Sequence, residues 1–161
     1  MAYLDPTTIV VEEVKHVAGI DIGYDADTDS AIVALVILDY PDLRVSGRDL
    51  SFPRCNRPQV KHTFLERVTP NQPYVPSFLS IRELDHVLAI YDKALQSIPL
   101  SDAPDVVFVD GFGRWHERQA GLATAFGVAR GVPTIGVGKD YQPLRPDLGV
   151  PLPRPTCVGS F

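Results

Sequence analysis

The sequence predicts an α/β fold built on one mixed β-sheet, and the order of its apolar segments is the main reason. Three β-rich segments come first, and a helical segment, a strand, a second helical segment and a last strand then alternate. Strands that follow one another directly are typical of an antiparallel meander, whereas strands separated by helices are typical of parallel pairing. At 161 residues, the chain is expected to form a single domain over 1–161 with one hydrophobic core.

The first three predicted strands lie in the first third of the chain. The stretch "HVAGIDIGY" over 16–24 is typical of a short buried strand, and "SAIVALVILD" over 30–39 is typical of a longer one after a turn at 25–29. The segment 42–52 alternates well enough to predict a third strand beside the second. Five prolines between 53 and 76 indicate a segment that is mostly loop.

The segment 77–98 predicts an amphipathic helix with Ser77 as its N-cap. Its apolar residues recur at steps of three and four: Ile81, Leu84, Leu88, Tyr91 and Leu95. The next segment, 105–111, is apolar on both faces and predicts a central strand.

The last predicted elements are a small-residue helix over 119–131, which Gly131 would end, and a buried strand over 133–139. From about residue 140 the chain contains five prolines and predicts an irregular tail. The whole order, β-β-β-α-β-α-β, is that of the ribonuclease H-like fold, whose chemistry depends on carboxylates at the ends of central strands.

The composition is that of a soluble globular protein, with 45% hydrophobic and 22% charged residues. No apolar run reaches the roughly 18–20 residues that a membrane span needs, and no signal-peptide pattern opens the chain, so no membrane partner is expected. The two cysteines, Cys55 and Cys157, lack metal-ligand spacing and are expected to be free thiols in the cytoplasm.

The net charge of −5 is unevenly distributed along the chain. Residues 1–43 carry nine acids and one lysine, for a balance of −8, whereas 44–67 (six basic, two acidic) and 112–161 (six basic, three acidic) carry +4 and +3. The two basic segments are compatible with a phosphate backbone as partner, and equally with an ordinary mixed surface.

Three carboxylates lie where apolar elements would bury them. Asp21 interrupts the first strand, Asp110 closes the strand over 105–111, and Glu83 shares a helix face with Val87 and Ile90. A buried carboxylate needs a hydrogen bond, a cation or exposure at a sheet edge. Three such acids suit a hard divalent ion such as Mg²⁺, which takes oxygen ligands, waters and substrate phosphate oxygens.

Each acid also has a purely structural explanation. Asp21 could form a turn hydrogen bond, Glu83 could oppose the helix dipole, and Asp110 could cap the loop after its strand. His116, which follows the glycine-rich loop, and Lys139, which ends the next strand, strengthen the interpretation as a site. Lys139 would hold a substrate phosphate or steer a nucleophile, unless it is simply solvated.

Four stretches resemble the successive signature blocks of the endonuclease V family of inosine-directed nucleases. They are "AGIDIGY", "PYVPSFLSIRE", "VFVDGFGRWHERQAGLATAFGV" and "PTIGVGK", and they span Val17 to Lys139 in the family's order. Four blocks in order and at nearly family-like spacing are far more specific than any one of them.

The resemblance implies a role for each matching residue. Asp21, Glu83 and Asp110 match the metal-binding carboxylates, and His116 and Lys139 match further catalytic residues. The matching substrate-binding residues are Pro73, Tyr74, Val75 and Pro76, which form a wedge between strands beside the lesion, and Gly111, Gly113 and Gly121, which would admit the extruded hypoxanthine.

The activity implied by the resemblance is divalent-metal-dependent hydrolysis of a phosphodiester near deoxyinosine in DNA or inosine in RNA. In the family the cut usually falls at the second phosphodiester on the 3′ side. The expected cofactor is Mg²⁺, with Mn²⁺ as a possible substitute, and the expected partner is DNA or RNA that contains inosine.

The sequence departs from the family pattern at several places. Ser77 replaces a usual glycine, Phe112 a usual polar residue and Asp140 a common lysine; the loop 53–72 is longer, and the region after Lys139 is short. Two alternatives therefore stand beside an active nuclease. One is a weakly active or inactive module that binds inosine or single strands; the other is an interaction protein that dimerises through a sheet face left bare. Both a monomer and a homodimer are compatible with the sequence.

Overall fold

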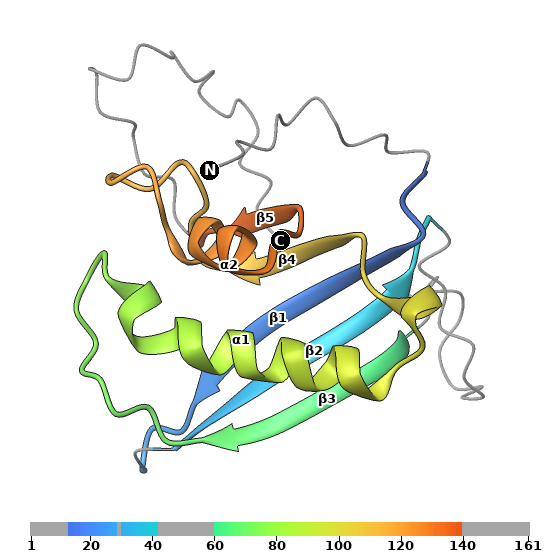
Figure 1. Ribbon diagram of the computed structural model, residues 1–161. Coiled ribbons are helices and arrows are strands. Elements are labelled where there is room, and N and C mark those ends of the chain that lie inside the picture. Colours follow the sequence, from blue (N-terminus) through green and yellow to red (C-terminus); the bar gives the residue numbers. More distant parts are fainter. Residues whose placement is uncertain (1–12, 29, 42–59, 140–161) are drawn as a thin grey trace, which may run out of the picture.

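The computed structural model describes residues 13–28, 30–41 and 60–139, which contain a five-stranded mixed sheet with the strand order β3-β2-β1-β4-β5 (Figure 1). Strands β1 (His16–Tyr24), β2 (Ala31–Asp39) and β3 (Val60–Val68) form an antiparallel meander. Strands β4 (Val106–Asp110) and β5 (Thr134–Val137) extend the sheet in parallel on the other side of β1. This order confirms the predicted ribonuclease H-like sheet.

The third strand is not where the sequence predicted it. The predicted strand 42–52 lies outside the described residues, and the observed β3 lies within 53–76, so the prediction of a mostly loop segment there is wrong for 60–68. The five prolines that suggested a loop all lie outside β3. Within β3, Phe64 and Val68 pack against the core while Leu65, on the opposite face, is 67% exposed, so a strand pattern was present.

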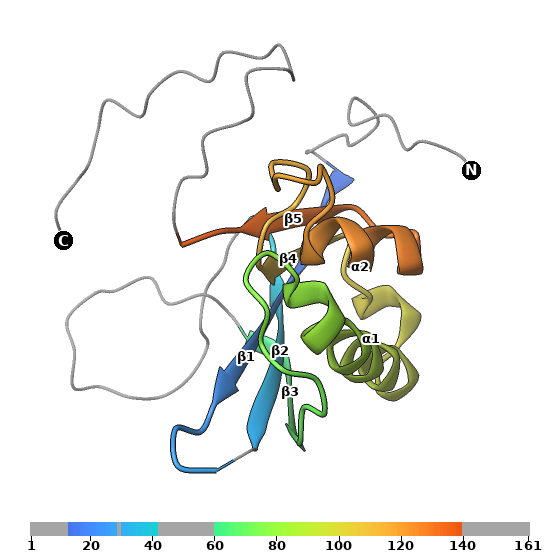
Figure 2. The same ribbon diagram turned by 90° about the vertical axis from the view of Figure 1, so that its left-hand side faces the viewer.

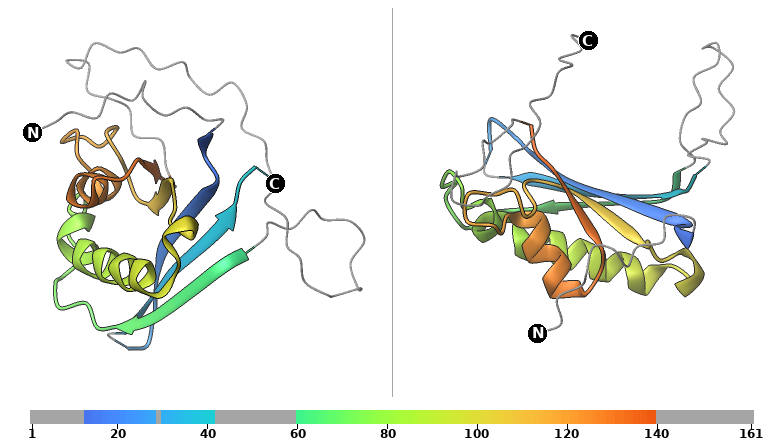
Figure 3. Two further views of the ribbon diagram at one scale, coloured as in Figure 1. Left: turned by 45° about the vertical axis from the view of Figure 1, so that its right-hand side comes forward. Right: turned by 90° about the horizontal axis from the view of Figure 1, so that it is seen from above.

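Two helices cover one face of the sheet: α1 (Leu79–Ser97) and α2 (Leu122–Arg130) lie on the same side in Figures 2 and 3. A 3₁₀ turn, Leu100–Asp102, follows α1. Gly131 ends α2 in the left-handed conformation (φ 64°), as predicted. Ser77 is not the cap of α1. The N-cap is Phe78, with no side-chain cap bond, because Ser77 itself has a positive φ of 66°.

The buried face of α1 differs from the predicted apolar stripe. The buried residues of the helix are Glu83, Val87, Ile90, Tyr91 and Ala94. Ile81 is 62% exposed and Leu95 37% exposed, so these two predicted core positions are wrong. Two overlapping stripes at helical spacing exist, and the stripe that contains a charge, Glu83, is the one that packs on the sheet.

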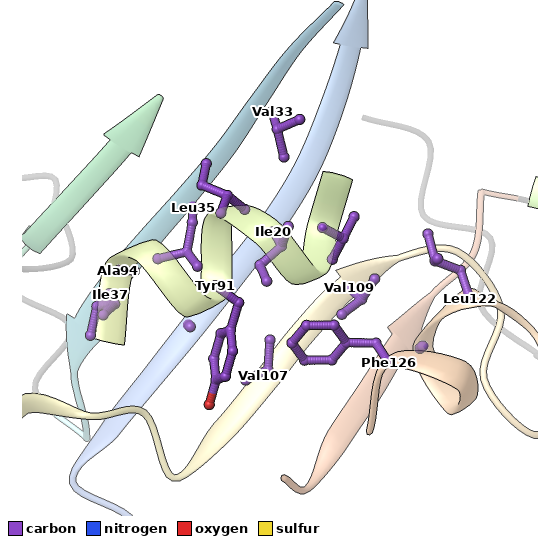
Figure 4. Close-up of a cluster of buried hydrophobic side chains, with 14 residues drawn as sticks. Ile20, Val33, Leu35, Ile37, Tyr91, Ala94, Val107, Val109, Leu122 and Phe126 are labelled. Atoms are coloured by element: carbon purple, nitrogen blue, oxygen red, sulfur yellow. The ribbon is translucent and has the colours of Figure 1, made fainter. Parts of the chain in front are cut away.

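The core lies between the sheet and the two helices (Figure 4). Phe126 of α2 is fully buried, and its ring meets that of Tyr91 edge-on at 5.1 Å between centroids. A bidentate ion pair from Arg130 to Asp92, with N···O distances of 2.7 and 2.6 Å, joins α2 to α1. These contacts fix α2, and therefore the loop that leads into it, against α1.

A polar network joins the three strands at the end of the sheet where β1 and β3 begin. The Lys61 ammonium lies 3.3 Å from the Asp39 carboxylate and 3.1 Å from that of Asp102. His16 pairs with Asp39 at 3.0 Å and His62 with Asp102 at 2.8 Å. Hydrogen bonds from His62 and Lys61 lower the pKa of Asp102 to about 2.

Across the described ranges, no helix is both long and apolar enough to cross a lipid bilayer. Cys55, Cys157, Asp140 and the predicted irregular tail lie outside these ranges.

Candidate active site

The two strand carboxylates lie side by side on the sheet. In β1 the side chains of Ala18 and Ile20 enter the core, so Asp21 points to the opposite face, away from the helices. In β4, Val109 enters the core, and Asp110 therefore points the same way as Asp21. Ile20 pairs with Val109 in the parallel register, which makes Asp21 and Asp110 the next neighbours along the two strands.

This placement forces two like charges together. Burial raises the pKa of the Asp110 carboxyl, and the charge of Asp21 and a hydrogen bond between the two carboxyl groups raise it further. Lys139, which follows β5, opposes the shift through its positive charge but does not cancel it. A second hydrogen bond, from the Ile22 amide to Asp21 Oδ1 at 2.7 Å, holds the Asp21 carboxylate in place. The pair is therefore electrostatically strained in a way that a cation relieves.

Glu83 comes from the buried face of α1, and the charges of Asp110 and Asp21 act on it. Its side chain is only 6% exposed, and its Oε1 accepts a 2.6 Å hydrogen bond from the Tyr24 hydroxyl. Burial raises the pKa of Glu83; the hydrogen bond from Tyr24 opposes this shift, while the charges of Asp110 and Asp21 add to it. The same burial and the bond to Glu83 raise the pKa of Tyr24 to about 12, so its hydroxyl remains a donor at neutral pH.

Arg82 stands next to this hydrogen bond. Its guanidinium carbon lies 4.4 Å from the centroid of the Tyr24 ring, a cation–π distance. Its charge lowers the pKa of Glu83 but is outweighed there by burial. Tyr24 and Arg82 were not predicted as site residues from the sequence. Their positions were the signal that the sequence offered for a role in the site, because Tyr24 ends the strand that carries Asp21 and Arg82 directly precedes Glu83.

The donor chemistry of this cluster fits a hard divalent cation. It consists of carboxylate oxygens, and at least two of the three carboxyls have raised pKa values. Within the ranges described, no three His, Cys, Asp or Glu side chains are arranged to hold a metal ion by themselves. Mg²⁺ commonly takes one or two carboxylates and completes its shell with water and phosphate oxygens, so the Asp21–Asp110 pair with Glu83 nearby is compatible with it.

The loop 111–121 leads from Asp110 into α2 and contains three of the predicted glycines. Gly111 has a φ of 130°, which an L side chain rarely adopts. Gly121 is packed so closely that a Cβ there would lie 2.0 Å from the Phe112 carbonyl oxygen. Gly113 is less confined, since its nearest contact would be at 3.7 Å, to the Gly136 amide. Gly111 and Gly121 therefore have a structural need for glycine, whatever else they do.

His116 is packed inside this loop and not displayed on it. The residue is 5% exposed; its Nδ1 accepts a 3.1 Å hydrogen bond from the Arg118 amide, and its ring lies 6.2 Å from that of Phe112. Lys139 is exposed and acts on Asp110 through charge. Lys139 therefore lies close enough to Asp110 for its charge to act on that carboxyl, and the catalytic roles of His116 and Lys139 stay predictions.

The predicted wedge, Pro73–Pro76, is exposed throughout, and Tyr74 is 61% exposed. An apolar hollow of about 290 Å³ lies beside it, lined by Gln72, Pro73, Val75, Phe78 and Ile81. Ser77, which replaces the usual glycine, has a positive φ, which explains why glycine suits this position.

Arg118 ties the wedge to the loop 111–121. Its guanidinium lies 3.7 Å from the centroid of the Phe78 ring and donates a hydrogen bond to the Ser77 carbonyl. The loop 111–121 and the segment 69–78 accordingly lie side by side, on the left in Figure 1 and toward the viewer in Figure 2. This contact was not predicted, because an arginine 41 residues away gives no local signal in the sequence.

Comparison with known proteins agrees with this geometry. The sequence pattern that defines the family "Endonuclease V" matches residues 4–147. A curated endonuclease V from Trichormus variabilis is 35% identical over 128 residues, which are 80% of this chain and 48% of that protein. The chain thus spans about half the length of this relative.

Solved structures give the same result. The catalytic domain of human endonuclease V superposes with a TM-score of 0.68 at 28% identity, covering 82% of this chain and 48% of that one. Ciona intestinalis endonuclease V, solved in complex with a 24mer DNA containing an inosine followed by a ribo-adenosine, gives a TM-score of 0.71 at 26% identity, covering 91% of this chain and 54% of that one. The sequence and the fold of this chain together show that it belongs to the endonuclease V family.

Proposed function

We propose that this protein is a divalent-metal-dependent endonuclease that hydrolyses a phosphodiester close to deoxyinosine or inosine. The observation that carries the proposal is the pairing of Asp21 and Asp110 on adjacent parallel strands, whose charges both act on Glu83. A protein that only binds nucleic acid gains nothing from carboxylates held against their own repulsion. Membership of the endonuclease V family supports the same reading.

The residues that would hold the ion are Asp21, Glu83 and Asp110. A divalent cation held there, Mg²⁺ or Mn²⁺, would polarise the phosphodiester and favour ionisation of an attacking water. The Tyr24 hydroxyl holds Glu83 Oε1 in one orientation, and the Ile22 amide does the same for Asp21 Oδ1. Fixed carboxylates need no rearrangement when the substrate arrives, which is the main contribution the chain makes to the rate.

Lys139 and His116 complete the proposed site. The Lys139 ammonium, whose charge already acts on Asp110, would neutralise a non-bridging oxygen of the bound phosphate. His116 would keep the loop 111–121 in shape through the hydrogen bond that its Nδ1 accepts. In the proposal, Tyr74 enters the space beside the displaced base, and the neighbouring prolines stiffen the loop for that task. Of the three predicted glycines, Gly113 would leave room for the base, whereas Gly111 and Gly121 are closely packed by Leu122 and Phe112.

The test is cleavage of end-labelled oligonucleotides that contain one inosine. Single-stranded DNA and RNA would be incubated with Mg²⁺, Mn²⁺ or EDTA, beside inosine-free strands. The expected result is one cut near the inosine in metal and none in EDTA. The Asp110→Ala variant would lose the cut, whereas Asp85→Ala, which removes an exposed carboxylate of the same helix that carries Glu83, would keep it.

Two results would contradict the proposal. Equal cleavage of inosine-free strands would remove inosine as the target. Inosine-dependent binding without any cut in either metal would make this chain a protein that binds inosine without cleaving the strand, which is the alternative that the sequence left open.

A further inference from the structure

Trp115 is a large exposed aromatic residue placed between two residues of the proposed site, Asp110 and His116. It is 49% exposed, whereas the adjacent His116 is 5% exposed, so the loop turns the imidazole inward and the indole outward. Tryptophan is highly buried on average in folded proteins, which makes a half-exposed one informative when its neighbours are also suited to binding.

Basic residues flank Trp115 in the loop 111–121. Arg114 and Arg118 flank it against one acid, Glu117, so the loop 111–121 carries a net charge of +1. Arg118 lies 3.7 Å from Glu117 and also packs on Phe78, which fixes the loop beside the wedge. Tyr74 of the wedge is 61% exposed. Two exposed aromatics thus stand on two loops that one arginine joins, at the end of the sheet where Asp110 lies.

We propose that Trp115 is a base-stacking residue that binds an unpaired nucleobase of a single strand, and this inference rests on the proposed function. Stacking on aromatic side chains beside basic residues is the usual way in which proteins hold single-stranded nucleic acid without reading its sequence. The stacked base is one that flanks the inosine, because the indole of Trp115 is turned outward, whereas Gly113, proposed to leave room for the inosine itself, lies against Gly136 of β5. Trp115 therefore raises affinity for single strands with and without inosine.

The chain contains one tryptophan, so its intrinsic fluorescence reports on this residue alone. The full chain in EDTA, where no cleavage occurs, would be titrated with a single-stranded oligothymidylate and with the same strand carrying one inosine. Fluorescence anisotropy of end-labelled strands would measure binding independently. Stacking predicts strong quenching that saturates at the same concentration as the anisotropy signal for both strands.

Variants make the result quantitative. Trp115→Ala is expected to weaken binding of both strands about tenfold, and Trp115→Phe to keep it within about threefold, because phenylalanine also stacks. Leu100→Ala, at a residue that is 91% exposed in the turn after α1, is the matched control and should bind like the unchanged protein. Circular dichroism of each variant would verify that it is folded.

Three outcomes would overturn the inference. The first is binding by anisotropy with unchanged tryptophan fluorescence and full affinity of Trp115→Ala. The second is loss of self-association, and not of strand binding, in Trp115→Ala, which would assign the residue to a protein interface. The third is no binding to any strand. If Trp115→Ala binds both strands with full affinity and still cuts near inosine in Mg²⁺, the stacking role is refuted and the proposed function stands.

Discussion

Replacement of Gly121 by alanine tests how tightly the site loop is built. A Cβ at this position would lie 2.0 Å from the Phe112 carbonyl oxygen and 2.6 Å from its carbonyl carbon. Ordinary van der Waals contact requires the distance between this Cβ and the Phe112 carbonyl oxygen to increase by about 1 Å or more. The obstacle is backbone, which cannot rotate away as a side chain can. The φ of Gly121 is −92°, so the substitution adds no backbone strain of its own.

The expected loss of stability follows from the contacts that the shift disturbs. Overpacking of this kind costs about 1–3 kcal/mol. The shift also weakens the hydrogen bonds from the Gly121 amide to the Gly113 carbonyl (3.0 Å) and from the Ala123 amide to the Phe112 carbonyl (3.2 Å). At about 1 kcal/mol each, these bring the expected loss to about 3–5 kcal/mol. Since the loop begins at Asp110, a displacement of about 1 Å would also lower any cleavage rate by about a hundredfold.

Urea unfolding followed by far-UV circular dichroism measures this loss, with Gly19→Ala as the matched control. A Cβ at Gly19 would meet nothing within 4 Å, so that variant should be as stable as the unchanged protein or more stable by about 0.5–1 kcal/mol. A Gly121→Ala protein within about 0.5 kcal/mol of Gly19→Ala would refute the close packing described for the loop.

Three further predictions concern the core and the two charge clusters. Phe126→Ala should lower the free energy of unfolding by about 3–5 kcal/mol, measured by urea denaturation, because the ring is fully buried against Tyr91; a loss below about 1 kcal/mol would contradict that packing. The pKa of Asp102 is lowered to about 2, so its contribution to stability is present above the ordinary value of 3.8 and is lost as the pH falls through about 2. Asp102→Asn should therefore flatten the thermal stability profile below pH 4, while Asp85→Asn should leave it unchanged. The pH dependence due to Glu83 has the opposite sign. Its pKa is raised from 4.5, so without metal the protein should lose stability as the pH rises from about 4.5 to the raised value. Glu83→Gln should remove part of that slope in EDTA, and an unchanged slope would show that the carboxylate is not strained.

The sheet order could be predicted from the sequence because it depends on apolar segments that are each long enough to recognise. Strand β1 was placed at its observed bounds, and α2 was found together with the glycine that ends it. The third strand was misplaced because proline content was given more weight than the alternation around Phe64. The prediction that Glu83 shares a buried helix face with Val87 and Ile90 is confirmed. The predicted burial of Ile81 and Leu95 was wrong, because a helix with two apolar stripes does not show which one the sheet covers.

Part of the candidate site could be predicted from the sequence. Carboxylates at the ends of apolar strands are visible as interruptions, and parallel pairing then brings Asp21 beside Asp110. The supporting contacts were not predictable in the same way. The bonds from Tyr24 to Glu83 and from Arg118 to Ser77 join residues 59 and 41 positions apart, and only the folded chain brings them together.

The most direct test of the central claim is the affinity of the protein for Mn²⁺, measured by electron paramagnetic resonance of the free ion. Asp110→Asn is expected to weaken this affinity by about tenfold or more, because the amide removes one of two paired charges and one oxygen donor. The exposed-carboxylate variant Asp85→Asn should bind Mn²⁺ like the unchanged protein. Equal affinity of the unchanged protein and Asp110→Asn would contradict the claim that the paired carboxylates of β1 and β4 form the metal site.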